Sequence, residues 1–262
     1  MERVGIIGGT NADFGFAWDG ARSVRTPFGS AEVATGGIPG TDVGVAFVRR
    51  HGTAHERLSS MVEHRANVWA LREAGCSAIL GTTVCGIVDP DVPLATAIVF
   101  DDLFFPDNRL PDGSPCTFFG TPGEPGRGHY LFGSPFSRAM RAALVTAGRA
   151  AGVPLLDGGT YAYTLGPRFN SRAEVAWIRG AGAVAVSQTA GPEAVLAGEL
   201  ELPYALVGFG VDYANGVHDE PTPVATLDAN IAASRPAFEA IVAGAADALA
   251  DATFEGFVYR FE

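Results

Sequence analysis

The sequence predicts an α/β domain built on a mainly parallel β-sheet with helices on its faces. Short apolar runs alternate with longer amphipathic segments, a pattern typical of strands buried on both faces between helices. The length of 262 residues suits a single domain over residues 1–262. Hydrophobic residues make up 47% of the chain and charged residues 18%, which is enough apolar side chain for a sizeable core.

Six apolar runs are expected to form the strands, at residues 3–8, 43–48, 77–82, 95–100, 183–188 and 203–211. The last run, PYALVGFGV, leads directly into Asp212 and an Asn-Gly turn. A carboxylate at the exit of a buried strand is costly unless it has a partner or a task. The alternative is an ordinary Asx-turn or helix cap after a strand.

Four segments have helical patterns, at residues 59–75, 137–152, 191–202 and 234–251. Gly75 stands where the first helix is expected to stop. Ser234 is expected to cap the last helix, with Pro236 in its first turn. The stretch 106–133 is crowded with Pro, Gly and Asp, and it predicts a long loop that serves as a lid, a binding loop or a subunit contact.

Charge and cysteine content exclude several classes of protein. The net charge of −11 argues against non-specific binding of nucleic acid, and an anionic substrate would need a local pocket. Cys76, Cys85 and Cys116 are odd in number and form no CxxC, so neither a disulfide framework nor a zinc knuckle is indicated. The start MERVGIIGGT has no signal-peptide pattern, and no apolar run has the length of a membrane span. We therefore expect a cytoplasmic protein without a membrane partner.

Polar residues gather where predicted strands end, which is where open α/β sheets bind ligands. Gly8-Gly9-Thr10 lacks a dinucleotide fingerprint but can form an anion nest, or simply a tight turn. Arg49-Arg50-His51 suits a phosphate or carboxylate, the alternative being a solvated basic turn. His51 and His55 are spaced as two metal ligands, but no third ligand accompanies them, so no metal is expected.

Three further clusters complete the set. GTTVCG (81–86) ends one strand with paired hydroxyls, and SQTAGPEAV (187–195) ends another with Gln188 and Thr189. In GPRFNSRAE (166–174), Phe169 offers a stacking face and Asn170 an amide, or Asn170 and Ser171 merely cap a helix. Together the clusters offer an anion cradle, an aromatic platform, amide groups and one acid. That combination suits a phosphate, a sugar and a heterocyclic base.

The order of these motifs resembles the methylthioadenosine phosphorylase branch of the trimeric purine nucleoside phosphorylase family. The resemblance spans nearly the whole chain and is carried by GIIGGT, TPFG (26–29), RHG (50–52), RANVWAL (65–71), GCSAILGTTVCG (75–86), GPRFNSRAE, TAGPEAVLA (189–197) and VDYA. It implies a mixed, distorted sheet flanked by helices, and a homotrimer or dimer of trimers. The implied reaction is reversible phosphorolysis of an N-glycosidic bond, with inorganic phosphate as co-substrate and no cofactor.

The resemblance also implies residue roles. Phosphate would be held by Gly9, Thr10, Arg50, His51, Thr83, the backbone at Val84, and Thr189. Phe169 would stack on the purine and Asn170 would lie near its edge. Gln188, His129 and His55 would lie around the sugar and its 5′ group. Asp212 would serve purine N7 as the catalytic acid, because a proton there lets the base leave neutral.

Several positions depart from the branch. Ala214 stands where relatives have a second Asp, and Gln188 where they have Met. VEHRAN, with Glu63 and His64, replaces VNYRAN, and LGPRF replaces EGPRF. Asp212 still favours an adenine-type base. Three activities stay open: a phosphorylase for methylthioadenosine or a related nucleoside, 6-oxopurine nucleosides included; a hydrolase; and a catalytically weak nucleoside-binding relative.

Overall fold

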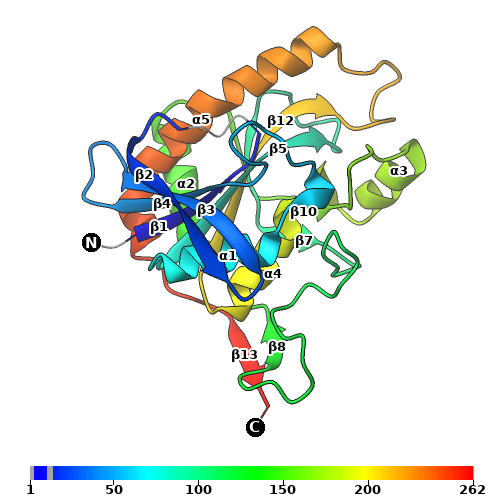
Figure 1. Ribbon diagram of the computed structural model, residues 1–262. Helices are drawn as coiled ribbons and strands as arrows, with labels where there is room; N and C mark the ends of the chain where they lie inside the picture. The colour runs from blue at the N-terminus through cyan, green and yellow to red at the C-terminus, as the bar shows by residue number, and fades with distance from the viewer. Residues whose placement is uncertain (1–2, 11–13, 262) are drawn as a thin grey trace.

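A large mixed sheet forms the centre of the molecule (Figure 1). In the computed structural model, which describes residues 3–10 and 14–261, this sheet has eleven strands. They are β1 (Arg3–Gly8), β2 (Ala17–Thr26), β3 (Gly29–Gly37), β4 (Gly44–Arg49), β5 (Ala78–Ile87), β6 (Ala97–Val99), β7 (Asp102–Phe104), β9 (Leu155–Asp157), β10 (Thr160–Tyr163), β11 (Ala183–Ser187) and β12 (Tyr204–Tyr213). The six predicted strands are all present, and the expected α/β fold with a mixed sheet is confirmed.

Strand β5 is the hub of the sheet, because it pairs with three other strands. Parallel β12 follows it from Ile79 to Ile87. On its other edge, parallel β1 pairs with residues 78–81, whereas antiparallel β11 pairs with Gly86 and Ile87. The sheet therefore splits along that edge of β5, between the end of β1 and the arrival of β11.

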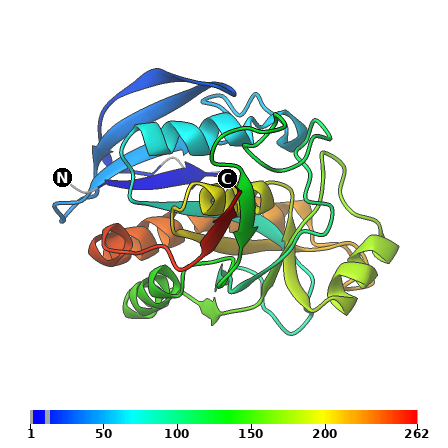
Figure 2. The same cartoon turned by 90° about the horizontal axis from the view of Figure 1, so that it is seen from below.

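Helices cover both faces of the sheet, as Figures 1 and 2 show. Helices α2 (Arg138–Ala150) and α5 (Val224–Ala250) pack together on one face, where α5 contacts β1, β5 and β12. Helices α1 (His64–Glu73) and α4 (Ala190–Glu199) pack together on the other face. Helix α3 (Arg172–Gly180) lies beside β11. The two faces correspond to two large apolar clusters, so the core is divided by the sheet.

The predicted boundaries of two helices were wrong. Helix α5 begins at Val224, so Ser234 lies in its interior and donates to the carbonyl of Ile231 instead of capping. Helix α5 begins ten residues earlier than predicted because Leu227 and Ile231, in the added turns, pack against the core. Residues 59–61 form a short 3₁₀-helix, and α1 starts only at His64. Hairpin β2–β3 was not predicted, because β2 is largely exposed and has no continuous apolar run.

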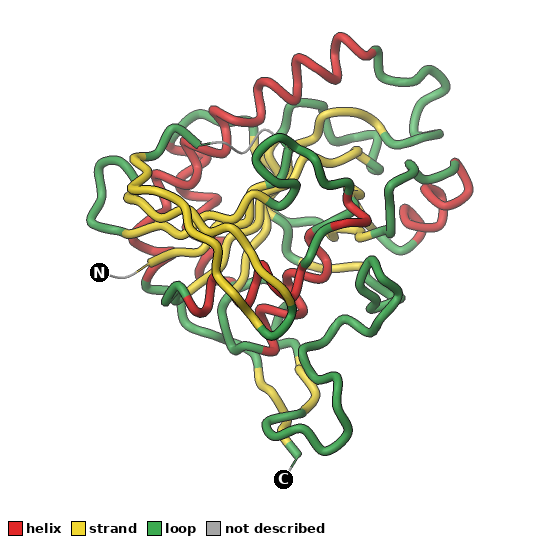
Figure 3. Tube along the Cα trace, in the orientation of Figure 1, coloured by secondary structure: helices red, strands yellow, loops and turns green. Residues whose placement is uncertain are grey.

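The predicted loop at 106–133 is mostly irregular, and Figure 3 shows it as a long green segment before β8 (Gly128–Leu131). Strand β8 pairs with the C-terminal strand β13 (Phe257–Arg260) in a separate two-stranded sheet. Leu110, Cys116 and Phe118 are buried in the core, and the loop contributes no side chain to the cavity described below. The loop thus packs against the rest of the protein through its own buried side chains and does not cover the cavity.

Candidate active site

A cavity of about 350 Å³ opens where the sheet splits. Thr83, Val84 and Cys85 line it, and they lie on the stretch of β5 between its pairing with β1 and with β11. The cavity collects residues that follow the carboxyl ends of several parallel strands, as expected for an open α/β sheet. All the predicted site residues line it except His129: Gly9, Thr10, Arg50, His51, His55, Thr83, Val84, Phe169, Asn170, Gln188, Thr189 and Asp212.

Arg50 joins the separated strands at one end of the cavity. Its side chain is fully buried, and it donates to the carbonyls of Thr82 (2.8 Å) on β5 and Ile7 (3.3 Å) on β1. Glu193 on α4 accepts from Nε at 2.5 Å and from Nη2 at 2.8 Å. Burial opposes the Arg50 cation, but the Glu193 carboxylate outweighs it and raises the pKa. One N–H on Nη1 is left for a ligand.

Gly9 is needed for this arrangement. A Cβ at this position would lie 2.7 Å from Nη1 of Arg50 and 2.9 Å from the carbonyl oxygen of Thr82. Any larger residue would therefore push the guanidinium away from the end of β1. The glycine serves the close approach of Arg50 at least as much as the anion nest expected from the sequence.

Two of the histidines near this end, His51 and His64, are uncharged at neutral pH. Burial, and then the nearby Arg50 cation, lower the pKa of His51 to about 4. Its Nδ1 lies 2.9 Å from the carbonyl of Arg57, and because a carbonyl only accepts, Nδ1 carries the proton. His55 stacks on His51 with ring centroids 4.7 Å apart. His64 is buried with Nδ1 3.8 Å from Oε1 of Glu193, and burial lowers its pKa to about 3.

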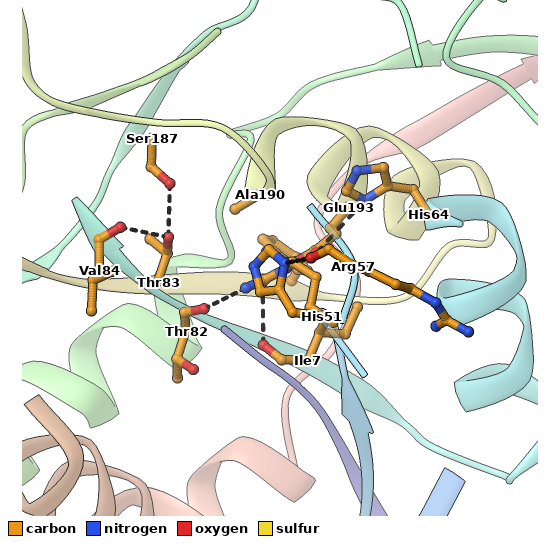
Figure 4. A network of polar contacts seen from close by, with 12 residues as sticks. Ile7, His51, Arg57, His64, Thr82, Thr83, Val84, Ser187, Ala190 and Glu193 are labelled. Atoms are coloured by element: carbon orange, nitrogen blue, oxygen red, sulfur yellow. Dashed lines mark hydrogen bonds and ion pairs between the residues drawn. The ribbon is translucent and has the colours of Figure 1, made fainter. Parts of the chain in front are cut away.

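Hydroxyl groups complete the same end. Thr83 and Ser187 share a hydrogen bond of 2.9 Å between their hydroxyls (Figure 4). Thr189 is the N-cap residue of α4, yet its side chain makes no capping bond. A free hydroxyl at a helix N-terminus beside Arg50 favours an anion, since the helix dipole adds partial positive charge there. We call the group Thr10, Arg50, His51, Thr83, Ser187 and Thr189 the anion end of the cavity.

Asp212 lines the cavity farther along the sheet, on β12 after a register shift at Gly210, where it pairs with Gly86 of β5, beyond Thr83. Burial raises its pKa to about 6, and only a bond to its own backbone acts against that. Its carboxyl group faces Gly86, where an added Cβ would stand 3.4 Å from Oδ1. Val211, Leu227 and Ile231 line the cavity with it. In this environment a carboxyl group is protonated more readily near neutral pH than an exposed aspartate is.

The loop between β10 and α3 contributes the rest of this part of the cavity, which we call the base end. Phe169 is 70% exposed, so its ring is free to cover a flat ligand. Asn170 accepts from the Thr164 hydroxyl at 2.9 Å, and its amide nitrogen takes no part in the bonds of the described residues. The cap alternative is also real, because Ser171 and Glu174 form a capping box at the start of α3. Capping is thus done by Ser171, which leaves Asn170 to the cavity.

His129 is the one predicted site residue that this chain does not bring to the cavity. It lies exposed on β8, in T-shaped contact with Phe261. Tyr259 on β13 and Phe261 just after that strand are exposed next to it, and β8 and β13 form the small sheet at the bottom of Figure 1. Any role at a nucleoside site would require a neighbouring chain.

Besides Ser187, sequence reasoning missed three residues that shape the site. Glu193 and Tyr204 are buried against Arg50, and the Tyr204 hydroxyl donates to Glu193 at 3.0 Å. A lone carboxylate in the apolar stretch GPEAVLAG was the available signal for Glu193. Ser59 lines the cavity and donates to Gln188, but 129 positions separate the two in the chain, so no local pattern indicates their contact.

The described residues hold neither a cluster of metal-binding side chains nor a helix that could cross a membrane. No group of three or more His, Cys, Asp or Glu side chains gathers as a metal site would among residues 3–10 and 14–261. Over the same residues, no helix combines the length and the apolar character needed to cross a membrane.

Known proteins are similar to this chain in sequence and in fold. The profile of the phosphorylase superfamily matches residues 3–247. The 6-oxopurine nucleoside phosphorylase of Pyrococcus furiosus is 36% identical over 223 residues, which cover 83% of this chain and 82% of that protein. The S-methyl-5′-thioadenosine phosphorylase of Mycolicibacterium smegmatis is 38% identical over 218 residues, covering 82% and 78%.

Among solved structures, methylthioadenosine phosphorylase from Schistosoma mansoni in complex with adenine matches with a TM-score of 0.84. It is 29% identical, and the match covers 94% of this chain and 90% of that one. The expected resemblance to the methylthioadenosine phosphorylase branch is confirmed, and the chain belongs to the phosphorylase superfamily.

Proposed function

We propose that this protein cleaves the N-glycosidic bond of methylthioadenosine, or of a related adenosine-type nucleoside, with inorganic phosphate. The observation that carries the proposal is the pairing of two features in one cavity. The anion end gathers hydroxyls around Arg50, and the base end holds Asp212 with its raised pKa. Relatives named as phosphorylases for this nucleoside support the choice of substrate.

The reaction needs these two ends to act on opposite sides of the sugar. A phosphate oxygen held at the anion end attacks C1′ as the C1′–N9 bond breaks, and the bonding electron pair passes into the purine. Positioning and electrostatic stabilisation of the oxocarbenium-like sugar supply most of the catalysis. Asp212 gives its proton to N7, so that the base leaves neutral, and regains a proton from solvent. We propose phosphate as co-substrate and no cofactor.

Asp212 favours a 6-aminopurine. A protonated carboxyl group can donate to N7 while its carbonyl oxygen accepts from the 6-amino group. With a 6-oxopurine the same carbonyl oxygen would face O6, and two acceptors would meet. Phe169 covers the base in this arrangement.

A 6-oxopurine substrate is the second candidate, and one observation favours it. The amide nitrogen of Asn170 is unused and could donate to O6, whereas Ala214 offers no second acceptor for an amino group. A panel of inosine, adenosine, 5′-deoxyadenosine and methylthioadenosine, each assayed with phosphate, separates the two. We expect the highest kcat/KM for methylthioadenosine; a highest value for inosine would establish the second candidate.

One finer proposal rests on family resemblance. We propose a homotrimer, or a dimer of trimers, in which His129 of one chain serves the sugar end of a neighbour's cavity. Its exposed position beside Tyr259 and Phe261 is compatible with a subunit contact. The cytoplasmic location and a role in purine salvage stay predictions.

A further inference from the structure

Gln188 and Ser59 form a polar pair on the cavity wall that belongs to neither the anion end nor the base end. Gln188 lies between β11 and α4, and Ser59 opens the short 3₁₀-helix before α1. Both line the cavity. Ser59 is nearly buried, and its hydroxyl lies 2.8 Å from Oε1 of Gln188.

The bonds of this pair fix its orientation. Nε2 of Gln188 lies 2.9 Å from the carbonyl oxygen of Arg168. That oxygen can only accept, so the amide nitrogen must face it and Oε1 must face Ser59. The Ser59 hydroxyl therefore donates to Oε1. What the pair has left for a ligand is one N–H of Gln188 and the oxygen lone pairs of both side chains.

The pair also lies between the two ends of the cavity. Gln188 is flanked by Ser187 and Thr189 of the anion end, and its amide is tied to the residue before Phe169 of the base end. In a nucleoside, the sugar is the part that lies between the base and the incoming phosphate. Gly166 makes room for the pair, because a Cβ there would collide with both Oε1 of Gln188 and Oγ of Ser59.

We propose that the Gln188–Ser59 pair recognises the vicinal hydroxyls of the ribose and makes the site selective for ribonucleosides over deoxyribonucleosides. The inference rests on the proposed function. Each sugar hydroxyl both donates and accepts, which complements one fixed N–H beside oxygen lone pairs. A sugar that lacks one of these hydroxyls leaves a polar group of the pair without a partner, and sites built in this way discriminate strongly.

The test compares adenosine with 2′-deoxyadenosine and 3′-deoxyadenosine as substrates of the full-length protein. For the wild type, we expect kcat/KM for adenosine to exceed that for at least one deoxy analogue about 10-fold or more. Gln188→Met keeps the length of the side chain but removes its polar groups. It should lower kcat/KM for adenosine and leave kcat/KM for the disfavoured deoxy analogue nearly unchanged. The ratio of the two values should then fall to about 3-fold or less.

Ser59→Ala should reduce the ratio in the same direction, and Ser60→Ala, next to it but outside the cavity lining, is the matched control. If the pair only ties two loops together, the substitutions lower kcat/KM equally for all three substrates. The ratio of kcat/KM for adenosine to that for each deoxy analogue then stays that of the wild type. That result, or a wild type with no ribose preference, overturns the proposal.

Failure of the proposed function gives a different result, namely no phosphate-dependent release of base from any of the nucleosides. The affinities of adenosine and its two deoxy analogues, measured by calorimetry on the wild type and Gln188→Met, then decide the same question. Equal affinities in the wild type contradict the role of the pair; a ribose preference lost in the variant supports it.

Discussion

At the scale of single residues, Asp212 is an ionisable side chain in largely apolar surroundings. It lies among apolar side chains of β12 and α5, and burial raises its pKa to about 6. The carboxyl group is therefore easier to protonate than an exposed aspartate, at a point where the proposed leaving group accumulates negative charge.

We expect Asp212→Asn to lower kcat/KM for methylthioadenosine by about 10²- to 10⁴-fold, the usual contribution of a general acid. The amide keeps a donor near N7, but it has no proton to transfer. Steady-state assays of base release at saturating phosphate check this. Exposed Asp219→Asn is the matched control and should retain the wild-type rate.

The same substitution should stabilise the fold at high pH. Because the folded pKa of Asp212 lies above its unfolded value of about 3.8, the folded state binds more protons between about pH 4 and 6, and stability falls as pH rises through that window. At pH 8 the wild type holds a buried charge that Asp212→Asn lacks. Urea unfolding should show the variant more stable by about 1–3 kcal/mol at pH 8, and by much less at pH 4. A constant difference across this range would contradict the raised pKa.

At the scale of elements, the Arg50–Glu193 pair holds β1, β5 and α4 together where the sheet splits. It supplies donors to the carbonyls of Ile7 and Thr82 at the split. A buried guanidinium without its carboxylate is an uncompensated charge in a low-dielectric setting.

Glu193→Gln should therefore lower the free energy of unfolding by about 3–5 kcal/mol. It should also raise the KM for phosphate more than the KM for the nucleoside, since the freed guanidinium no longer holds its place at the anion end. Chemical denaturation and two-substrate kinetics measure the two effects. Tyr204→Phe removes only one hydrogen bond to Glu193 and should cost about 1 kcal/mol with the same direction in KM. Equal changes in both KM values would argue against a role in phosphate binding.

What the sequence could predict at this scale depended on local pattern. Strands β5 and β12 were predictable because their apolar runs are continuous, and so was the gathering of polar residues at their ends. Hairpin β2–β3 was not, because its exposed strands have no apolar run, and the first half of α5 was hidden by the cap-like Ser234 and Pro236. The Ser59–Gln188 contact depends on tertiary packing alone.

At the scale of the whole molecule, one small sheet stands apart from the body. Strands β8 and β13 carry exposed aromatic and aliphatic side chains, Leu131, Phe257 and Tyr259 among them. His129 belongs to β8 and pairs with Tyr259 of β13. Exposed apolar groups clustered in this way are typical of a contact between proteins.

For the proposed homotrimer, light scattering should give a mass of about three or six times the 27.2 kDa of the chain. Phe257→Asp together with Tyr259→Asp should shift the mass toward the monomer and reduce activity, because His129 could no longer reach a neighbour's cavity. Exposed Val224→Asp, on the far helix α5, is the control. A monomeric wild type with full activity would contradict the assembly.

The most direct test of the account as a whole is the release of adenine from methylthioadenosine by the wild-type protein, measured with and without inorganic phosphate. The anion end and Asp212 together predict release that requires phosphate, saturates with it, and yields one sugar 1-phosphate for each adenine formed. Release at the same rate without phosphate, with free sugar as the product, would show a hydrolase and contradict the account.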